Sequence, residues 1–344
     1  MGKTVLTMRE VARRAGVSQA TVSLCLANNP LASAATRARV QKVARELGYR
    51  TNPLVSAHMR TRRRPAGRTD RPVIAVINTQ AKRNAWRRHQ AQILPQMWEG
   101  VCRRIDERGY GMEEFWWHDP AMPPQRLCEI LRWRGISAAL FGPSGGTPLV
   151  IPAALDDLAV VRIGSGEVTP ALHRVSNNQY ATARLAVAAC VAAGYTRPGL
   201  VVPETLNLHH DRLWEAGFDV ECKHRLGLCP VPILFRDYDE LAPQFDPWFK
   251  RHRPDVIIDT SQEDALVRLR QLGVKVPAEV GFVSLCSPAL GHPLSGTVQD
   301  GVEVGARAVD LLIHLLEQHE TGVPARPLTQ LTVPVWNAGT TLKG

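Results

Sequence analysis

The chain has 344 residues, of which 44% are hydrophobic and 22% charged, a balance that is ordinary for a globular protein and argues against wholesale disorder. A chain of this length usually divides into more than one packed unit. The sequence contains no run of 18 apolar residues, and residues 1–9 lack the apolar core of a signal peptide. We therefore expect a cytoplasmic protein without a membrane partner.

The net charge of +10 is concentrated at the N-terminus. Residues 1–71 hold fifteen Lys and Arg against three acids, a net charge of +12, whereas residues 72–344 hold 27 basic residues against 29 acids, a net charge of −2. A basic head on a near-neutral body is typical of a nucleic-acid-binding module, because each neutralised phosphate releases condensed counterions. The other interpretation is a solvated basic arm that has no partner.

Two short helices joined by a tight turn are predicted after residue 7. Thr7 and Glu10 have the spacing of a capping box, which begins a helix, and Gly16 ends that helix because it accepts a left-handed conformation. Ser18 is a suitable N-cap for a second helix over residues 19–26. A helix, a glycine-containing turn and a second helix form the helix-turn-helix pattern.

A third helix is predicted to complete the head, which we place at residues 1–50. Asn28, Asn29 and Pro30 break the chain, Ser33 caps the third helix, and Gly48 ends it. The apolar faces of the three helices are large enough to close a small core, so the head is expected to be an all-α domain.

The start of the second helix is the element expected to enter the major groove of double-stranded DNA. Gln19 can pair with adenine through two hydrogen bonds, and Ala20 allows contact with a thymine methyl group. Four hydroxyl side chains suit phosphate contacts, which set register but carry no sequence information. These are Thr7, Ser18, Thr21 and Ser23. The alternative for any one of these residues is a plain capping or surface role.

The head resembles the DNA-binding domain of the lac repressor family of bacterial transcriptional regulators. The resemblance rests on REVARRAGVSQATVS at residues 9–23, followed by Ser33, Thr36-Arg37 and Leu47-Gly48-Tyr49. It implies a repressor that binds a palindromic operator as a homodimer. Leu24 stands where the family commonly has an arginine that reads guanine, so this base contact is either apolar or absent.

Residues 51–71 correspond to the hinge helix and linker of the family. The resemblance implies a phosphate contact at Asn52 and a hinge that orders on the operator and inserts an apolar side chain into the minor groove. His58 stands at the position of the usual wedge leucine, with Met59 beside it. The arginines around Pro65 then form a charged tether.

Residues 72–344 alternate short β-branched runs with long amphipathic stretches, which predicts parallel sheets covered by helices on both faces. The runs lie at 73–77, 138–141, 160–163, 200–202, 256–258 and 280–285. Gly109-Tyr110, Arg134-Gly135-Ile136, Ala193-Gly194-Tyr195 and Leu272-Gly273-Val274 resemble landmarks of the family's periplasmic-binding-protein-like sensor. The resemblance implies two doubly wound subdomains, with chain crossings near Arg174, Thr297 and residues 323–328.

A small-molecule effector is expected in the cleft at the carboxyl ends of the strands. The candidate residues follow strand ends: Asn78, Arg162, Arg212, Asp259, Ser261 and Cys286. Sugar-binding relatives usually have Asn-Asp and a later Asp where this chain has Ser261-Gln262 and Cys286, so a carboxylate for sugar hydroxyls is missing. We expect a less hydroxylated or partly aromatic effector. Trp86, Trp116 and Trp117 either stack on such a ring or pack in the core.

No enzyme, cofactor or metal site is predicted. The sequence has no Walker loop, no G-x-G-x-x-G, no G-x-S-x-G and no HExxH. Its seven cysteines are scattered and never spaced as CxxC. The weak alternatives are a metal at Cys222 and Cys229 with His209 and His210, and a nucleophilic or redox-sensing Cys286.

Two functions remain open. The first is an effector-responsive transcription factor, and the second is an architectural or constitutive DNA-binding protein whose sensor serves only for dimerisation. A ligand that binds only the folded body must raise its melting temperature, which separates the two.

Overall fold

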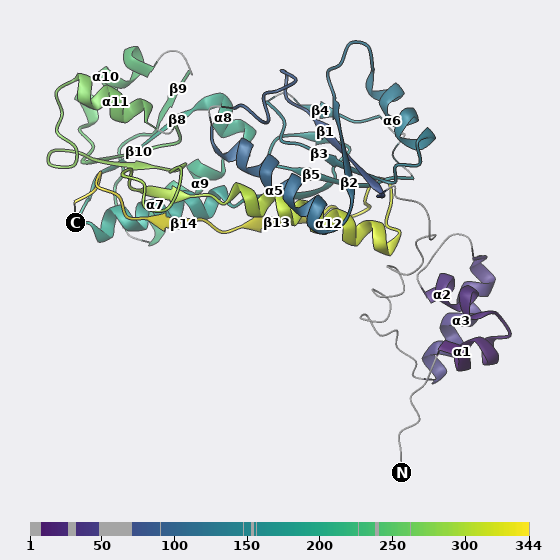
Figure 1. Ribbon diagram of the computed structural model, residues 1–344. Coiled ribbons are helices and arrows are strands. Elements are labelled where there is room, and N and C mark those ends of the chain that lie inside the picture. The colour runs from purple at the N-terminus through teal and green to yellow at the C-terminus, as the bar shows by residue number, and fades with distance from the viewer. Residues whose placement is uncertain are drawn as a thin grey trace.

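The computed structural model describes residues 8–26, 32–47, 71–89, 91–146, 148–152, 155, 157–225, 227–237, 241–261 and 263–343. Within these residues it shows an all-α head and an α/β body with two six-stranded sheets (Figure 1). The predicted fold class is confirmed. None of the helices in this part of the chain is long and apolar enough to cross a membrane.

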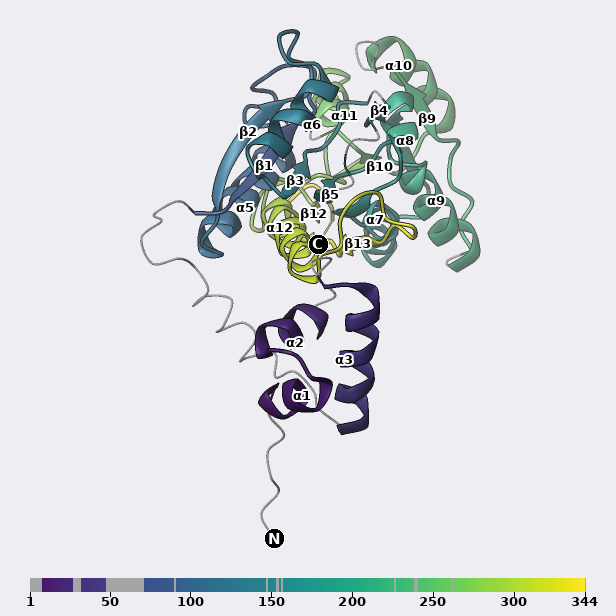
Figure 2. The ribbon, with the colours of Figure 1, turned by 90° about the vertical axis from the view of Figure 1, so that its right-hand side faces the viewer.

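The head consists of α1 (Met8–Ala15), α2 (Gln19–Leu26) and α3 (Ala34–Leu47), which pack on one another (Figure 2). Their shared core contains Val11, Val22 and Val40, each fully buried. Gly16 has a φ of +63° and ends α1, as predicted. The Ser33 hydroxyl accepts a hydrogen bond from the amide of Thr36 at 3.2 Å, which confirms it as the cap of α3.

The first subdomain of the body is built on a parallel sheet in the order β13-β7-β5-β3-β1-β2. Its strands are β1 (Val73–Asn78), β2 (Gly111–Trp116), β3 (Ala138–Phe141), β5 (Ala159–Ile163), β7 (His173–Asn177) and β13 (Thr329–Thr332). Helices α5 (Ile93–Glu107) and α12 (Gly301–Gln318) cover one face, and α6 (Pro124–Trp133) covers the other. A short pair, β4 (Leu149–Val150) and β6 (Val168–Thr169), lies outside this sheet.

The second subdomain has a similar sheet in the order β14-β12-β11-β10-β8-β9, which is parallel except for the antiparallel edge strand β14. Its strands are β8 (Pro198–Pro203), β9 (Leu234–Arg236), β10 (Val256–Asp259), β11 (Gly281–Ser284), β12 (Gly296–Val298) and β14 (Val335–Asn337). Helices α7 (Gln179–Ala192) and α9 (Leu213–Asp219) pack on one face, with the short α8 (Glu204–His209) and the π-helix η1 (Val220–Arg225) beside them. Helices α10 (Leu241–His252) and α11 (Asp264–Gln271) cover the opposite face.

The chain passes between the two sheets three times. It leaves the first sheet after β7, returns between β12 and α12, and leaves again between β13 and β14. The third passage was predicted at residues 323–328, and this prediction is wrong. Strand β13 still pairs with β7, from Thr329 opposite Arg174 to Thr332 opposite Asn177, so the chain crosses only after it.

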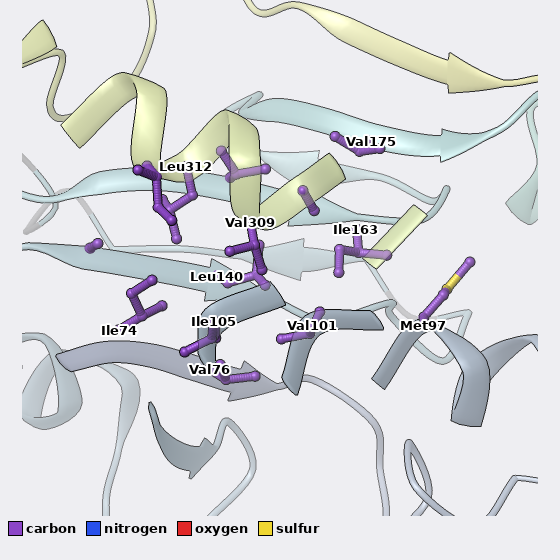
Figure 3. Close-up of a cluster of buried hydrophobic side chains, with 14 of the residues drawn as sticks. Ile74, Val76, Met97, Val101, Ile105, Leu140, Ile163, Val175, Val309 and Leu312 are labelled. Carbon is purple, nitrogen blue, oxygen red and sulfur yellow. The ribbon is translucent and has the colours of Figure 1, made fainter. Parts of the chain in front are cut away.

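The core of the first subdomain joins α5 and α12 to the sheet. In Figure 3, Val101 and Ile105 from α5 and Val309 and Leu312 from α12 point toward the strands. The two helices approach at backbone distance, because a Cβ atom on Gly305 would overlap the carbonyl oxygen of Met97. The two helices lie about 200 positions apart in the sequence, and their contact holds these parts of the subdomain together. Glycine is required where their backbones meet.

Helices of both subdomains end in a common motif. In α5, Gly109 has a φ of +74°, and the amide of Tyr110 donates to the carbonyl oxygen of Ile105 at 3.0 Å. This six-to-one hydrogen bond is the Schellman motif, which ends a helix and buries the apolar residue that follows glycine. It recurs at Gly135, Gly194 and Gly273. The landmark residues thus turn the chain from each helix toward the next strand.

Candidate functional site

The start of α2 presents the residues expected to read DNA. The Ser18 hydroxyl accepts a hydrogen bond from the amide of Thr21 at 3.1 Å and lies 2.9 Å from the Thr21 hydroxyl, so Ser18 caps the helix. Gln19 and Ala20 follow immediately and are both exposed, while Val22 in the same helix is fully buried. The helix therefore holds Gln19 and Ala20 outward at its N-terminal end, where a groove-binding helix contacts bases.

Leu24 lies one helical turn after Ala20 on α2. Its side chain is half-buried and packs against the head core, which also contains Val22 and Cys25. The guanidinium expected of the family is thus replaced by an apolar side chain that is partly used for packing. Ser23 is also half-buried.

The head as a whole is positively charged. The described residues of the head include seven Lys and Arg and only two acids, Glu10 and Glu46. Glu10 forms an ion pair with Arg13 in the same helix, and this pair lowers the pKa of the Glu10 carboxyl group. Thr7, Asn52, His58 and Met59, together with the capping box of Thr7, lie outside the described residues.

Three of the predicted cleft residues shape the loops after their strands. The Asn78 side chain is fully buried, donates to the carbonyl oxygen of Arg83 at 2.6 Å and accepts from the amide of Gln80 at 3.0 Å. Asp259, also fully buried, accepts from the hydroxyl of Ser261 at 2.7 Å and from its amide at 3.0 Å. Burial raises the pKa of Asp259 to about 6, although these hydrogen bonds oppose the shift.

Arg212 and Cys286 have different surroundings. Arg212 is exposed, has a φ of +55°, and forms ion pairs with Glu204 and Glu215, each at 2.8 Å. Cys286 is half-buried, and its sulfur accepts a hydrogen bond from Nε2 of Gln299 at 3.7 Å. Burial raises the pKa of the Cys286 thiol to about 12, so the thiolate needed for nucleophilic or redox chemistry is disfavoured.

Gln299 belongs to a buried amide group near the passages of the chain. Its Nε2 donates to the Leu285 carbonyl oxygen at 3.0 Å and to Oε1 of Gln179 at 3.1 Å. The indole Nε1 of Trp214 donates to the same Gln179 oxygen at 2.9 Å. No sequence motif marks Gln179 or Gln299, because only the fold brings these two positions together.

The two subdomains meet where the loop after β5 faces α8. A Cβ atom on Gly166 would lie 2.5 Å from Cε1 of His209 and 2.8 Å from Oγ of Ser144, so any side chain at this position would displace these groups. Arg174 of β7 also reaches Asp211, with 3.7 Å between Nη1 and Oδ2. The boundary between the subdomains is therefore in close contact at this point.

Arg162 lies beside this contact. It is 8% exposed, and its register partner on β7 is Arg174. Its Nη1 donates to the carbonyl oxygen of Ser165 at 3.1 Å. Burial, with added repulsion from Arg174, lowers the pKa of Arg162 to about 10. Arg162 is therefore a buried cation at the carboxyl end of β5, whereas Arg212, the other predicted arginine, is exposed.

A histidine pair from the second subdomain adjoins the same boundary. The ring centroid of His210 lies 4.4 Å from that of Trp214 and 5.1 Å from that of His209. Burial, with repulsion from His209 and Arg174, lowers the pKa of His210 from 6.5 to about 3. The folded protein therefore holds this imidazole neutral.

His210 should make folding stability depend on pH. Since its pKa is depressed in the folded state, the stabilisation is complete above pH 6.5 and is lost as the pH falls toward 3. The slope from one such group is about 1.4 kcal/mol per pH unit. We expect His210→Gln to flatten the decline of Tm between pH 6.5 and 4.5, measured by calorimetry. The matched variant at the exposed His314, His314→Gln, should keep the original slope, and equal slopes for both variants would contradict the assignment.

The tryptophans are mainly part of the core. Trp86 is fully buried with its ring centroid 5.1 Å from that of Trp98, and Trp117 is buried against Phe141. Trp116 is half-buried and donates to the carbonyl oxygen of Gln80 at 2.9 Å. Packing therefore explains Trp86 and Trp117.

The proposed metal alternative gains no support from the structure. Cys222 is buried, and burial raises the pKa of its thiol to about 12, whereas Cys229 is exposed. In the described part of the chain, no three His, Cys, Asp or Glu side chains are grouped so that they could hold a metal ion.

Two cavities lie away from the subdomain boundary. One of about 580 Å³ is lined by residues of α10 and of the loops that follow α10 and α11, including Phe249, Arg253 and Leu272. The other, of about 400 Å³, lies at the end of α12, where His173, His319 and Arg326 line it. Neither includes a predicted cleft residue.

The chain matches two protein-family models. Residues 7–52 match the model of bacterial regulatory proteins of the lacI family, and residues 187–337 match the periplasmic binding protein-like domain. Together the two models match more than half of the chain. No curated protein sequence matches it.

Solved structures show the same fold over nearly the whole chain. The transcriptional regulator CelR in complex with cellobiose is 18% identical, with a TM-score of 0.60, covering 98% of this chain and 99% of that one. The lac repressor dimer bound to operator and the anti-inducer ONPF is 19% identical, with a TM-score of 0.58 and the same coverage. A LacI-family regulator from Silicibacter pomeroyi is 22% identical, with a TM-score of 0.55, covering 98% of this chain and 100% of that one.

The helix-turn-helix head and the periplasmic-binding-protein-like body define a two-part transcriptional regulator, a class that is not enzymatic. The chain belongs to the lacI family of bacterial regulatory proteins. It accordingly has a DNA-binding domain and an effector-binding domain.

Proposed function

We propose that the protein is a repressor that binds a palindromic operator as a homodimer and is modulated by a small molecule in the cleft between its subdomains. The observation that carries this proposal is the exposed Gln19-Ala20 end of a capped helix in a basic head. Relatives with the same fold include a lac repressor dimer bound to operator and a regulator bound to cellobiose. A two-fold dimer would present two such helices to two half-sites.

The proposed organisation follows the family. Residues 1–50 form the DNA-binding domain, residues 51–71 the hinge and linker, and residues 72–344 the effector-binding and dimerisation domain. Gln19, Ala20 and Leu24 face the bases, and Thr7, Ser18, Thr21, Ser23 and Asn52 face phosphates. His58 and Met59 approach the minor groove.

Selection from random DNA with the full-length protein tests this proposal. We expect an inverted repeat whose half-sites are separated by about one helical turn, because a two-fold dimer places its recognition helices about 34–36 Å apart. Light scattering of the same protein should give the mass of a dimer. Selected sequences without two-fold symmetry, or a monomer bound to the operator, would refute the dimeric model.

Gln19 should determine one base pair in each half-site. We expect Gln19→Ala to relax preference at that pair, a loss on the order of 1–3 kcal/mol, because a bidentate contact to adenine is removed. Thr21→Val is the matched control, since the loss of a phosphate contact should weaken all sequences alike. Binding motifs selected by the two variants can be compared directly. A motif for Gln19→Ala that equals the parent motif would show that this side chain does not read the base.

A constitutive DNA-binding protein is the second candidate. It is favoured by the close contact of Gly166 with His209, and by the engagement of Asn78, Asp259 and Ser261 in local hydrogen bonds. A thermal-shift screen of metabolites separates the candidates, since an effector that binds the folded body must raise its Tm. If no metabolite changes Tm or operator affinity, the second candidate replaces the first.

A further inference from the structure

Arg162 has the properties of a ligand-binding cation rather than those of a structural ion pair. Its side chain is buried, yet within the described residues no carboxylate lies within 4.0 Å of its guanidinium. The hydrogen bond to the Ser165 carbonyl oxygen satisfies one of five N–H donors. A buried charge is costly unless it is paired, so this arrangement destabilises the protein without a ligand.

The groups around Arg162 add positive charge. Arg174 lies next to it across the β5–β7 pair. His209 faces the same loop, but its pKa is lowered first by burial and then by Arg162, so its imidazole is neutral and supplies no counter-charge. Asp211 supplies a carboxylate, but it lies 3.7 Å from Arg174 and is 62% exposed. The boundary therefore contains more cationic groups than the nearby carboxylate can balance.

The neutral groups nearby are hydrogen-bond donors. The hydroxyls of Ser165 and Ser176 lie 3.4 Å apart, and the Ser144 hydroxyl reaches the Ser165 carbonyl oxygen at 3.5 Å. Hydroxyls beside a guanidinium are suited to the oxygens of a carboxylate or a phosphate. In the sequence, Gln262 and Cys286 stand where relatives that bind sugars usually carry acids, and this exchange removes charges that would repel an anion.

We propose that the effector of this protein is an anion, whose carboxylate or phosphate group binds Arg162 at the carboxyl end of β5. This inference rests on the proposed function, namely that the cleft binds a small molecule. It identifies the chemical class of that molecule and disfavours neutral polyols and cations. Because Gly166 closely contacts the His209 ring, this ring must move away from the loop after β5, by itself or with its subdomain, to open the space beside Arg162.

The test uses the full-length protein with sodium acetate and sodium phosphate as the simplest carboxylate and phosphate probes. Sodium chloride at equal ionic strength is the reference for both. We expect at least one of the two anions to raise Tm above the chloride value, and the larger effect identifies which anionic group the site prefers. In Arg162→Gln the affinity should fall about tenfold or more, because a charge-assisted hydrogen bond is lost.

Arg126→Gln is the matched control, because Arg126 is an exposed arginine of the same subdomain, paired with Glu129. It should retain the response of the parent protein. In chloride alone, Arg162→Gln should keep or raise Tm, since it removes a buried charge without a carboxylate partner. If Arg162 only stabilised the fold, Arg162→Gln would instead lower Tm in every buffer.

Several outcomes would overturn the inference. They are equal anion responses in Arg162→Gln and the parent protein, no response to either anion, and a lower Tm of Arg162→Gln in chloride. A neutral metabolite that stabilises the parent protein and Arg162→Gln equally would leave the cleft as a sensor but refute an anionic effector. An operator affinity that no metabolite changes would refute the proposed regulation itself.

Discussion

A protein that starts at Pro72 should lose operator binding. Residues 1–71 carry a net charge of +12, and the remaining chain carries −2. The head also contains α2, with Gln19 and Ala20 exposed at its start. Without this helix and its charges, we expect affinity to fall by about 10³ or more, the usual gap between specific and non-specific binding. Fluorescence anisotropy with a selected operator measures this loss.

The salt dependence of operator affinity independently tests whether residues 1–71 form the DNA-binding surface. For the full-length protein, the logarithm of affinity should fall with the logarithm of salt concentration, with a slope of roughly 0.9 per phosphate contacted. Several contacts therefore give a slope of several units. The shortened protein should still unfold cooperatively when its circular dichroism is followed with temperature, which controls for folding of the body. Tight operator binding by the folded body alone would show that the DNA-binding surface has been placed in the wrong part of the chain.

The sequence predicted those parts of the fold that depend on local chemistry. Ser18 and Ser33 cap helices in the structure as expected, because a cap needs only a hydroxyl within three residues of an amide. Gly16 and Gly109 end helices because a left-handed residue is required there. The buried central strands were also found, since their apolar runs are continuous.

Short strands at the edges and near the chain passages were missed. Strand β13 has the sequence TQLT, and its burial is slight, so no apolar run marks it. Its pairing with β7 depends on residues about 155 positions earlier in the chain. This pairing also moved the third chain passage beyond the predicted residues. Tertiary contacts outweigh intrinsic preference in strands of this kind.

The cleft was predicted less completely than the head. Asp259 and Ser261 have the sequence position of ligand-binding residues, but Asp259 accepts hydrogen bonds from Ser261 and from the amide of Ala265 at the start of α11. Arg162 was chosen because it follows a buried run, whereas its proximity to Arg174 arises from the register of β5 and β7. His209 and His210 were considered only as metal ligands. Their place at the boundary depends on the fold of the second subdomain.

Gly305→Ala should destabilise the body even though alanine favours helices. Alanine in place of glycine normally stabilises a helix by about 1 kcal/mol. At this position, however, the new Cβ atom would overlap the carbonyl oxygen of Met97 and lie 2.9 Å from the amide nitrogen of Val101. Helices α5 and α12 would have to separate, which disturbs the core shown in Figure 3. We expect a net loss of about 2 kcal/mol, since overpacking costs about 1–3 kcal/mol or more.

The matched control adds alanine to the same helix where there is no such contact. His314 is exposed on α12, so His314→Ala gains helix propensity without steric overlap and should leave stability unchanged or slightly higher. Urea unfolding of both variants, followed by circular dichroism, gives the two free energies of unfolding. If Gly305→Ala were as stable as His314→Ala, the backbone contact between α5 and α12 would not exist in solution. A loss confined to Gly305→Ala means that glycine is needed there to let two helices, far apart in the sequence, pack as one layer on the first sheet.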